Sequence, residues 1–265
     1  MWKAQGLSKK LAIPGLCFVI SVSSMPPAMA APDAPGDLDL SFAGFGAGVK
    51  IIITGVPMPT AFERHGMTLQ PDGKIVVVGY TGVSLLVIRY LSNGAQDMTF
   101  GDGGIATFLN PQHAMRGTSV AIQADGKIIV AGWADTNPSN FLLARPTTSG
   151  TLDPTFSSDG FVTTDFDAGN DYATAVLIQP NGKIVAAGWG SIGTDDDFVA
   201  VRYNVDGTLD TAFVGDGKVT IGFGDYDTSY DAALQDDGKL WPVQHPPAKG
   251  RHALAFLNQR LVALH

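Results

Sequence analysis

Cysteine, charge and helical periodicity are all scarce in this chain of 265 residues. Cys17 is the only cysteine, so the sequence predicts no disulfide and no cysteine-based zinc site. Charged residues make up 16% of the chain, and the formal net charge is −8. We therefore expect no broad basic surface and no nucleic-acid partner. No segment sustains a helical period, whereas 32 glycines are typical of a turn-rich β protein.

The first 30 residues have the features of a secretory signal peptide. Three lysines precede an apolar run over residues 11–22, and Ala28-Met29-Ala30 supplies a small-x-small cleavage pattern. The apolar run is too short to span a membrane and contains Pro14 and Gly15. We expect a secreted, periplasmic or cell-surface protein with no transmembrane segment. Cleavage would remove three lysines and no acid, which takes the formal net charge from −8 to −11.

A hairpin motif recurs four times after a short Pro-rich leader at residues 31–36. Its clearest copy is Leu177-Ile178-Gln179-Pro180-Asn181-Gly182-Lys183-Ile184-Val185-Ala186-Ala187-Gly188. An Asn-Gly or Asp-Gly pair between two apolar runs predicts a β-hairpin with a type I′ turn. The four pairs are Asp72-Gly73, Asp125-Gly126, Asn181-Gly182 and Asp237-Gly238.

A second marker keeps the same period. Asp39, Asp97, Asp153 and Asp210 occupy equivalent Leu-Asp-like motifs, 58, 56 and 57 residues apart. Residues 37–265 are therefore predicted to form a single repeat domain. Its repeats cover residues 37–94, 95–150, 151–207 and 208–265.

The last repeat departs from this pattern after Lys239. Pro242 stands where the other repeats continue an apolar strand, and proline is poorly tolerated in a central strand. A natural edge, a truncated array and a shifted reading frame all remain open as explanations.

The third repeat shows the strands most clearly. Residues 160–166, 173–179, 183–189 and 197–203 are rich in β-forming residues, and we expect them to form one four-stranded sheet. Two of these strands are apolar at consecutive positions, so both faces of the sheet must be covered. Sheets stacked around an axis satisfy this requirement.

We therefore predict an all-β, β-propeller-like fold with four four-stranded blades of about 57 residues. A β-solenoid or an incomplete propeller is the alternative. The four blades would close as a monomer, or two chains would form a homodimer that completes a larger ring.

The combined motif resembles the delta-60 repeat family of bacterial secreted and surface proteins. The resemblance rests on Leu152-Asp153-Pro154-Thr155-Phe156, on Gln179-Pro180-Asn181-Gly182-Lys183-Ile184-Val185 and on Arg202-Tyr203, and it covers about residues 37–240. It implies a propeller-like β structure at a secreted or surface location. It supplies no catalytic residue, because members of this family mostly lack an assigned activity.

Residues that recur in every repeat are predicted to be architectural, since one active site needs only one copy. Arg89, Arg145 and Arg202 recur at a strand end, and we expect each to pair with the Asp of the Leu-Asp motif. Tyr80, Trp133 and Trp189 also recur. We expect them to pack between blades, and stacking on a flat sugar ligand is the alternative.

Acidic residues gather in the loops of the later repeats, where carboxylates at alternate positions suit a hard cation such as Ca²⁺. The EF-hand pattern is not met, because Gly169 stands where a ligand is needed and no Glu follows. Solvated loop acids are the alternative. The candidate ligands are Asp165, Asp167, Asp171, Asp195, Asp196 and Asp197.

Catalytic candidates are few. Glu63 is the only glutamate, His65 and His113 do not recur, and Ser119 lies in a sequence that only approximates a nucleophile elbow. The sequence therefore favours a binding or structural module with a protein or glycan ligand and no cofactor. An extracellular hydrolase of an ester or glycan, with its site on non-repeated loop residues, is the alternative.

Overall fold

The computed structural model describes residues 66–222, 227–234 and 240–244, and strands are the only regular elements in these ranges. The described residues include no helix long and apolar enough to cross a membrane. The predicted all-β class is therefore confirmed. The catalytic candidates Glu63 and His65 and the part of the first repeat that precedes Gly66 lie outside the described residues.

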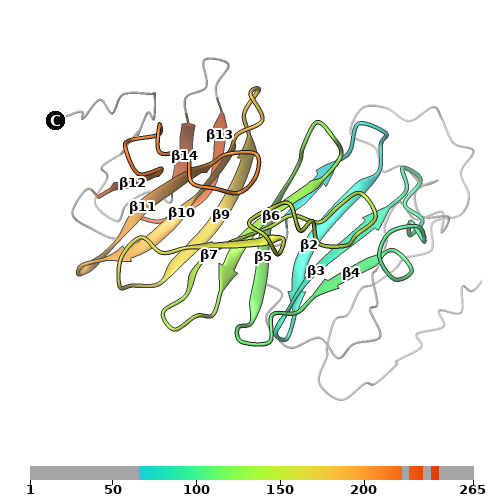
Figure 1. The fold of residues 1–265 in the computed structure, drawn as a ribbon, viewed down its shortest axis with the longest axis horizontal. Coiled ribbons are helices and arrows are strands. Elements are labelled where there is room, and N and C mark those ends of the chain that lie inside the picture. Colours follow the sequence, from blue (N-terminus) through green and yellow to red (C-terminus); the bar gives the residue numbers. More distant parts are fainter. Residues whose placement is uncertain (1–65, 223–226, 235–239, 245–265) are drawn as a thin grey trace, which may run out of the picture. The chain divides into compact units, whose positions relative to one another are not determined.

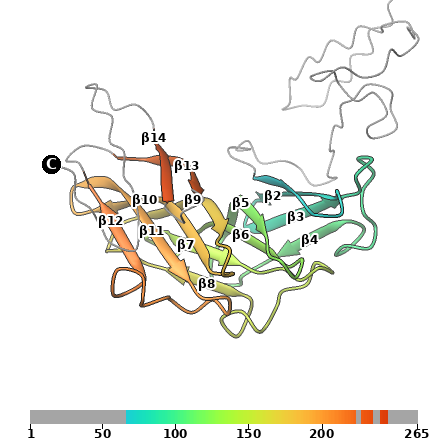
Figure 2. The same ribbon diagram turned by 90° about the horizontal axis from the view of Figure 1, so that it is seen from above.

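Three four-stranded antiparallel sheets and one hairpin follow one another along the chain (Figure 1 and Figure 2). The first sheet comprises β1 (Met67–Leu69), β2 (Ile75–Thr81), β3 (Ser84–Tyr90) and β4 (Ile105–Phe108). The second comprises β5 (Met115–Ile122), β6 (Ile128–Ala134), β7 (Asn140–Ala144) and β8 (Phe161–Thr164). The third comprises β9 (Asp171–Ile178), β10 (Ile184–Ile192), β11 (Asp195–Tyr203) and β12 (Lys218–Ile221), and the hairpin comprises β13 (Ser229–Leu234) and β14 (Leu240–Gln244).

Each described four-stranded sheet takes its fourth strand from the following repeat. β8 follows the Leu-Asp motif of the third repeat, yet it pairs with β7 of the second, with Phe141 opposite Thr164. The expectation that residues 160–166 join the sheet of their own repeat is therefore wrong. The reason is local: the motif is a tight reversal in which Gly160 N–H donates to Phe156 O and Arg145 N–H donates to Gly160 O. The chain consequently returns beside the strand that it has just left.

The hairpin turns also differ in type from the prediction. Gly73 N–H donates to Gln70 O at 2.9 Å, and within this turn only Gly73 has a positive φ, 81°. This is a type I turn followed by a left-handed glycine, and not the type I′ turn that needs two left-handed residues. Pro71 at the second position of the turn favours type I, because its ring fixes a negative φ.

The consecutive apolar residues are buried on both faces, as predicted. In β6, Ile128 and Val130 pack into the core shared with the first sheet, whereas Ile129 and Ala131 pack into the core shared with the third. Alternate residues of a strand point to opposite faces. The second sheet therefore contributes one face to each of two hydrophobic cores, and its stability depends on both neighbouring sheets.

The strand after Lys239 continues through the proline. β14 pairs with β13, and Pro242 lies opposite Ala232. Proline has no backbone donor, but it is tolerated at a sheet edge, and within the described residues β14 pairs with β13 alone.

Candidate functional site

The repeated arginine forms an ion cluster in each described repeat, which confirms the predicted Arg–Asp pairing. Arg145 Nε of the second repeat lies 3.0 Å from Asp153 Oδ2 of the third, and Lys127 Nζ lies 3.0 Å from the same oxygen. The guanidinium also stacks on Phe156, 4.6 Å from the ring centroid. Burial disfavours the charged form of Asp153, but hydrogen bonds from Thr155 and Lys127 and the charge of Arg145 outweigh it and hold its pKa well below the usual range.

The same geometry recurs, with Arg–Asp distances of 2.8 Å for Arg89–Asp97 and 2.6 Å for Arg202–Asp210. Each of the first two arginines also reaches the following repeat. Arg89 donates to Thr148 O at 2.7 Å, and Arg145 donates to Val205 O. These clusters therefore join adjacent repeats and serve the architecture of the domain.

The repeated residues Trp133 and Trp189 both pack against Tyr172, and the Trp133 contact joins two sheets, as predicted. Trp133 and Tyr172 meet edge to face with their centroids 5.1 Å apart, and Tyr172 lies 4.5 Å from Trp189. The Arg116 guanidinium lies 4.7 Å from the Tyr80 ring and 5.9 Å from Trp133. One stack of aromatic rings and the Arg116 guanidinium thus runs across three sheets.

The acidic candidates are not brought together into a cation site. Within the described ranges, no three His, Cys, Asp or Glu side chains form a group able to hold a metal ion. Asp196 Oδ1 accepts from the Ser191 hydroxyl at 2.7 Å. The carboxyl of Asp171 is fully buried. Burial, with the nearby charges of Asp165 and Asp167, raises its pKa to about 7 although Phe166 N–H donates to it.

The catalytic candidates are likewise separated. Glu63 and His65 lie outside the described residues. His113 is half-buried in the loop before β5 and does not line the cavity that contains Ser119. Of the two catalytic candidates in the described ranges, Ser119 lines this pocket and His113 does not.

That pocket is built on β-bulges at equivalent positions of the first strands of three sheets. The bulged residues are Thr118 on β5, Thr174 on β9 and Tyr230 on β13, which the register of each hairpin leaves without a cross-strand partner. A bulge redirects a side chain and is common beside functional sites. At the bulges of Thr118 and Thr174, the glycine that ends the Ile-Val-like run makes room for the bulge, because a Cβ on Gly132 or Gly188 would overlap the carbonyl oxygen of Arg116 or Tyr172.

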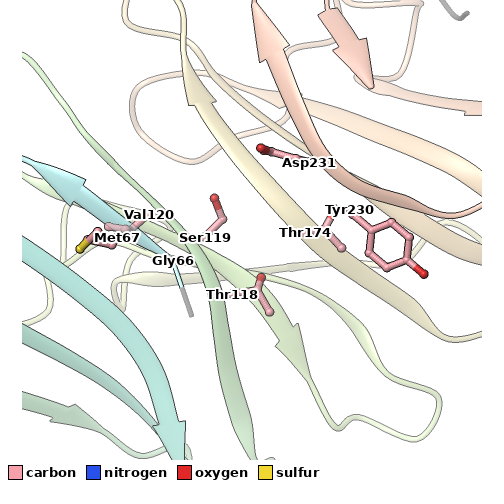
Figure 3. Close-up of a pocket in the computed structure, with 8 residues that line it drawn as sticks. All are labelled: Gly66, Met67, Thr118, Ser119, Val120, Thr174, Tyr230 and Asp231. Carbon is pink, nitrogen blue, oxygen red and sulfur yellow. The ribbon is translucent and has the colours of Figure 1, made fainter. Parts of the chain in front are cut away.

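The cavity, which we call the inner-strand pocket, has a volume of about 370 Å³ (Figure 3). Ser119 Oγ accepts from Val176 N–H at 3.1 Å, and Thr118 donates to Ala173 O at 2.7 Å, so both hydroxyls join β5 to β9. The lining residues are Gly66, Met67, Thr118, Ser119, Val120, Thr174, Tyr230 and Asp231.

The polar residues of this pocket are repeated only in part, unlike the Arg–Asp clusters, because Thr118 and Thr174 are identical but the equivalent residue of β13 is Tyr230. The position after the bulge is Ser119 in one repeat and Asp231 in another, and in the first repeat the sequence has His65 at the position of Thr118. Sequence reasoning missed Thr174 and Tyr230. The constant spacing from Thr118 to Thr174 and on to Tyr230, 56 residues each, was the available signal.

A second, wider cavity of about 560 Å³ lies toward the turn ends of the same strands. Its walls are mainly apolar and include Leu69, Ile122 and Ile178. The first strands of the sheets thus border both cavities, and Thr118, Ser119 and Thr174 line the smaller one, beside the bulges.

Three segments of the chain, residues 70–100, 123–156 and 179–213, match a family model described as "Domain of unknown function (DUF5122) beta-propeller". Each segment begins at the hairpin turn and ends at the phenylalanine of the ion cluster. The chain carries β-propeller repeats. No curated protein matches it.

Several solved structures are similar to these propeller repeats. A catalytically inactive virginiamycin B lyase from Staphylococcus aureus is 17% identical, with a TM-score of 0.43, over 73% of this chain and 51% of the lyase. An endo-arabinanase from Bacillus licheniformis is 12% identical, with a TM-score of 0.42, over 76% of this chain and 72% of that one. The chain spans about half the length of the lyase, and at these identities the likeness assigns no activity.

Proposed function

We propose that the protein is a secreted or cell-surface member of the delta-60 repeat family that acts as a binding module, with its ligand in the inner-strand pocket. The observation that carries this proposal is the contrast between repeated and non-repeated residues. The Arg–Asp clusters and the aromatic stack recur and are occupied by internal contacts, whereas the pocket residues are repeated only in part. A cavity of about 370 Å³ is within the usual size of small-ligand sites.

The location is supported by the signal-peptide pattern of residues 1–30. A protein or a glycan would be the partner, and only an end group or a protruding side chain of such a partner would enter the pocket.

A hydrolase is the weaker candidate. A serine nucleophile needs an adjacent base, itself held by a third group. Ser119 Oγ accepts a hydrogen bond from the backbone N–H of Val176. Within the described residues, the pocket lining contains no histidine.

Filling the pocket tests the proposal. Ser119→Phe should abolish retention of the purified protein on polysaccharide or cell-wall material, whereas Val83→Phe at an exposed turn (55% exposed) should retain it. Both variants and the wild type should show no turnover of generic ester and glycoside substrates. Retention that survives Ser119→Phe would place the ligand elsewhere, and turnover lost in that variant would favour the hydrolase.

A further inference from the structure

The polar groups of the inner-strand pocket have a particular hydrogen-bonding capacity. Ser119 Oγ already accepts from Val176 N–H, and among the described residues no acceptor takes the hydrogen of its hydroxyl. Thr118 donates to Ala173 O at 2.7 Å, and Thr174 donates to Ala187 O at 3.4 Å. Ser119 is therefore the hydroxyl of these three that retains a donor for a ligand.

Asp231 supplies the complementary acceptor. Its Oδ1 accepts from Ala232 N–H at 2.8 Å, which fixes the carboxylate, while Oδ2 has no donor among the described residues. Asp231 is solvent-exposed, and no Lys or Arg lines the pocket in the part of the chain that the structure describes. Figure 3 shows the Ser119 and Asp231 side chains projecting from β5 and β13 into the space that they border.

These capacities select among ligand classes. An ammonium group only donates, so it would satisfy Asp231 and leave the Ser119 donor unpaired. A carboxylate or phosphate only accepts, and Asp231 would repel it. A hydroxyl group both donates and accepts, and a compound with neighbouring hydroxyls can use Ser119 and Asp231 together. Met67 also lines the pocket, and its exposed side chain can contact the C–H face of such a compound.

We propose that the inner-strand pocket takes a neutral polyhydroxyl ligand, such as a sugar residue at the end of a glycan. This rests on the proposed binding function and deepens it. Ser119 donates to one hydroxyl oxygen, and Asp231 Oδ2 accepts from a neighbouring hydroxyl. No bond is made or broken in the ligand.

Isothermal titration of the full chain with four probes tests the ligand class. Xylitol and methyl glucoside are neutral polyols, glucuronate adds one negative charge to a sugar, and ethylammonium is a cation without hydroxyls. We expect at least one neutral probe to bind, glucuronate to bind more weakly than methyl glucoside, and ethylammonium not to bind. Failure of both neutral probes, or preference for either charged probe, overturns the proposal.

Two variants assign the contacts. Asp231→Asn keeps an oxygen for Ala232 N–H and should weaken binding about tenfold, as expected for a charge-assisted hydrogen bond. Ser119→Ala should weaken binding by a similar factor. Ser191→Ala is the matched control, because its hydroxyl bonds to Asp196 outside the pocket, and it should bind as the wild type does. Neutral-probe binding that is unchanged in both pocket variants contradicts the proposal. If Ser119→Ala does not fold, the result for Asp231→Asn is decisive by itself.

The failure of this proposal is distinct from failure of the binding function. A charged probe whose binding is abolished by Ser119→Phe leaves the pocket as the ligand site and changes only the ligand class. A probe of any class that binds Ser119→Phe and the wild type equally removes the pocket from the binding function as well.

Discussion

The carbonyl oxygen of Tyr172 occupies the space that a Cβ on Gly188 would need. These two residues lie on adjacent strands at the bulge of Thr174, where Gly188 pairs with Ala173 and Ala187 pairs with Ala175. Gly188 is not among the glycines with a positive φ. A glycine is therefore needed at this position for the space that it leaves, and not for its backbone conformation. The bulge that directs Thr174 to the inner-strand pocket therefore depends on a glycine in the neighbouring strand.

Gly188→Ala should destabilise the protein by about 2 kcal/mol, since the methyl group must displace backbone. Gly193→Ala is a matched control, because its φ is 66° but nothing lies within 4 Å of the added Cβ. That control should cost about 1 kcal/mol for the left-handed backbone alone. Urea denaturation measures both, and an equal cost at the two positions would contradict the steric account of the bulge.

The period of the hairpin motif and the apolar residues at consecutive strand positions were sufficient to predict the fold class. The Arg–Asp pairing was predictable for the same reason, since Arg145 and Asp153 recur together. It was not predictable from the sequence which repeat supplies the fourth strand of each sheet, because this depends on the tight reversal from Arg145 to Gly160. Periodicity alone is the same whether a strand joins the preceding or the following repeat.

The candidate site was predicted only at Ser119. Thr174 and Tyr230 line the pocket because each lies at a bulge. The pattern of apolar residues in the sequence did not indicate where these bulges occur. Asp231 on β13 and Ser119 on β5 line one pocket although they are more than 100 residues apart in sequence, and this arrangement depends on the fold.

The Arg145–Asp153 pair offers a test of the architecture. Both side chains are buried, with Arg145 2% and Asp153 4% exposed. Arg145→Met leaves the buried Asp153 carboxylate with its Lys127 ion pair alone, and Asp153→Asn leaves the buried Arg145 guanidinium without a carboxylate. Each should cost about 3 kcal/mol. The double variant should cost less than the sum of the two. A double-mutant cycle by denaturation measures the coupling, and strictly additive losses would show that the two groups stabilise the protein independently.

The aromatic stack predicts a spectroscopic effect. Tyr172 lies between Trp133 and Trp189, so Tyr172→Leu should reduce the near-ultraviolet circular dichroism of both tryptophans. Lost ring contacts should cost about 1–2 kcal/mol, given that an aromatic pair contributes about 0.5–1.5 kcal/mol beyond its buried area. Tyr90→Leu, buried elsewhere, is the comparison, and it should leave the tryptophan signal unchanged. Equal spectral changes in the two variants would contradict the stack.

Asp171 predicts an unusual pH dependence of stability. Its pKa is raised from 3.8 to about 7 in the folded protein, so between these values the folded state binds more protons than the unfolded state. The contribution of the protonated carboxyl is complete below pH 4 and is lost as the pH rises toward 7, by about 1.4 kcal/mol per pH unit at most. Asp171→Asn removes this titration while keeping an oxygen for Phe166 N–H. The variant should therefore gain stability relative to the wild type on going from pH 5 to pH 8. Urea denaturation of both proteins at each pH measures the difference, in which the titration of Asp97, Asp153 and Asp210 cancels. A difference that is the same at both pH values would show that Asp171 is already ionised at pH 5 in the folded protein.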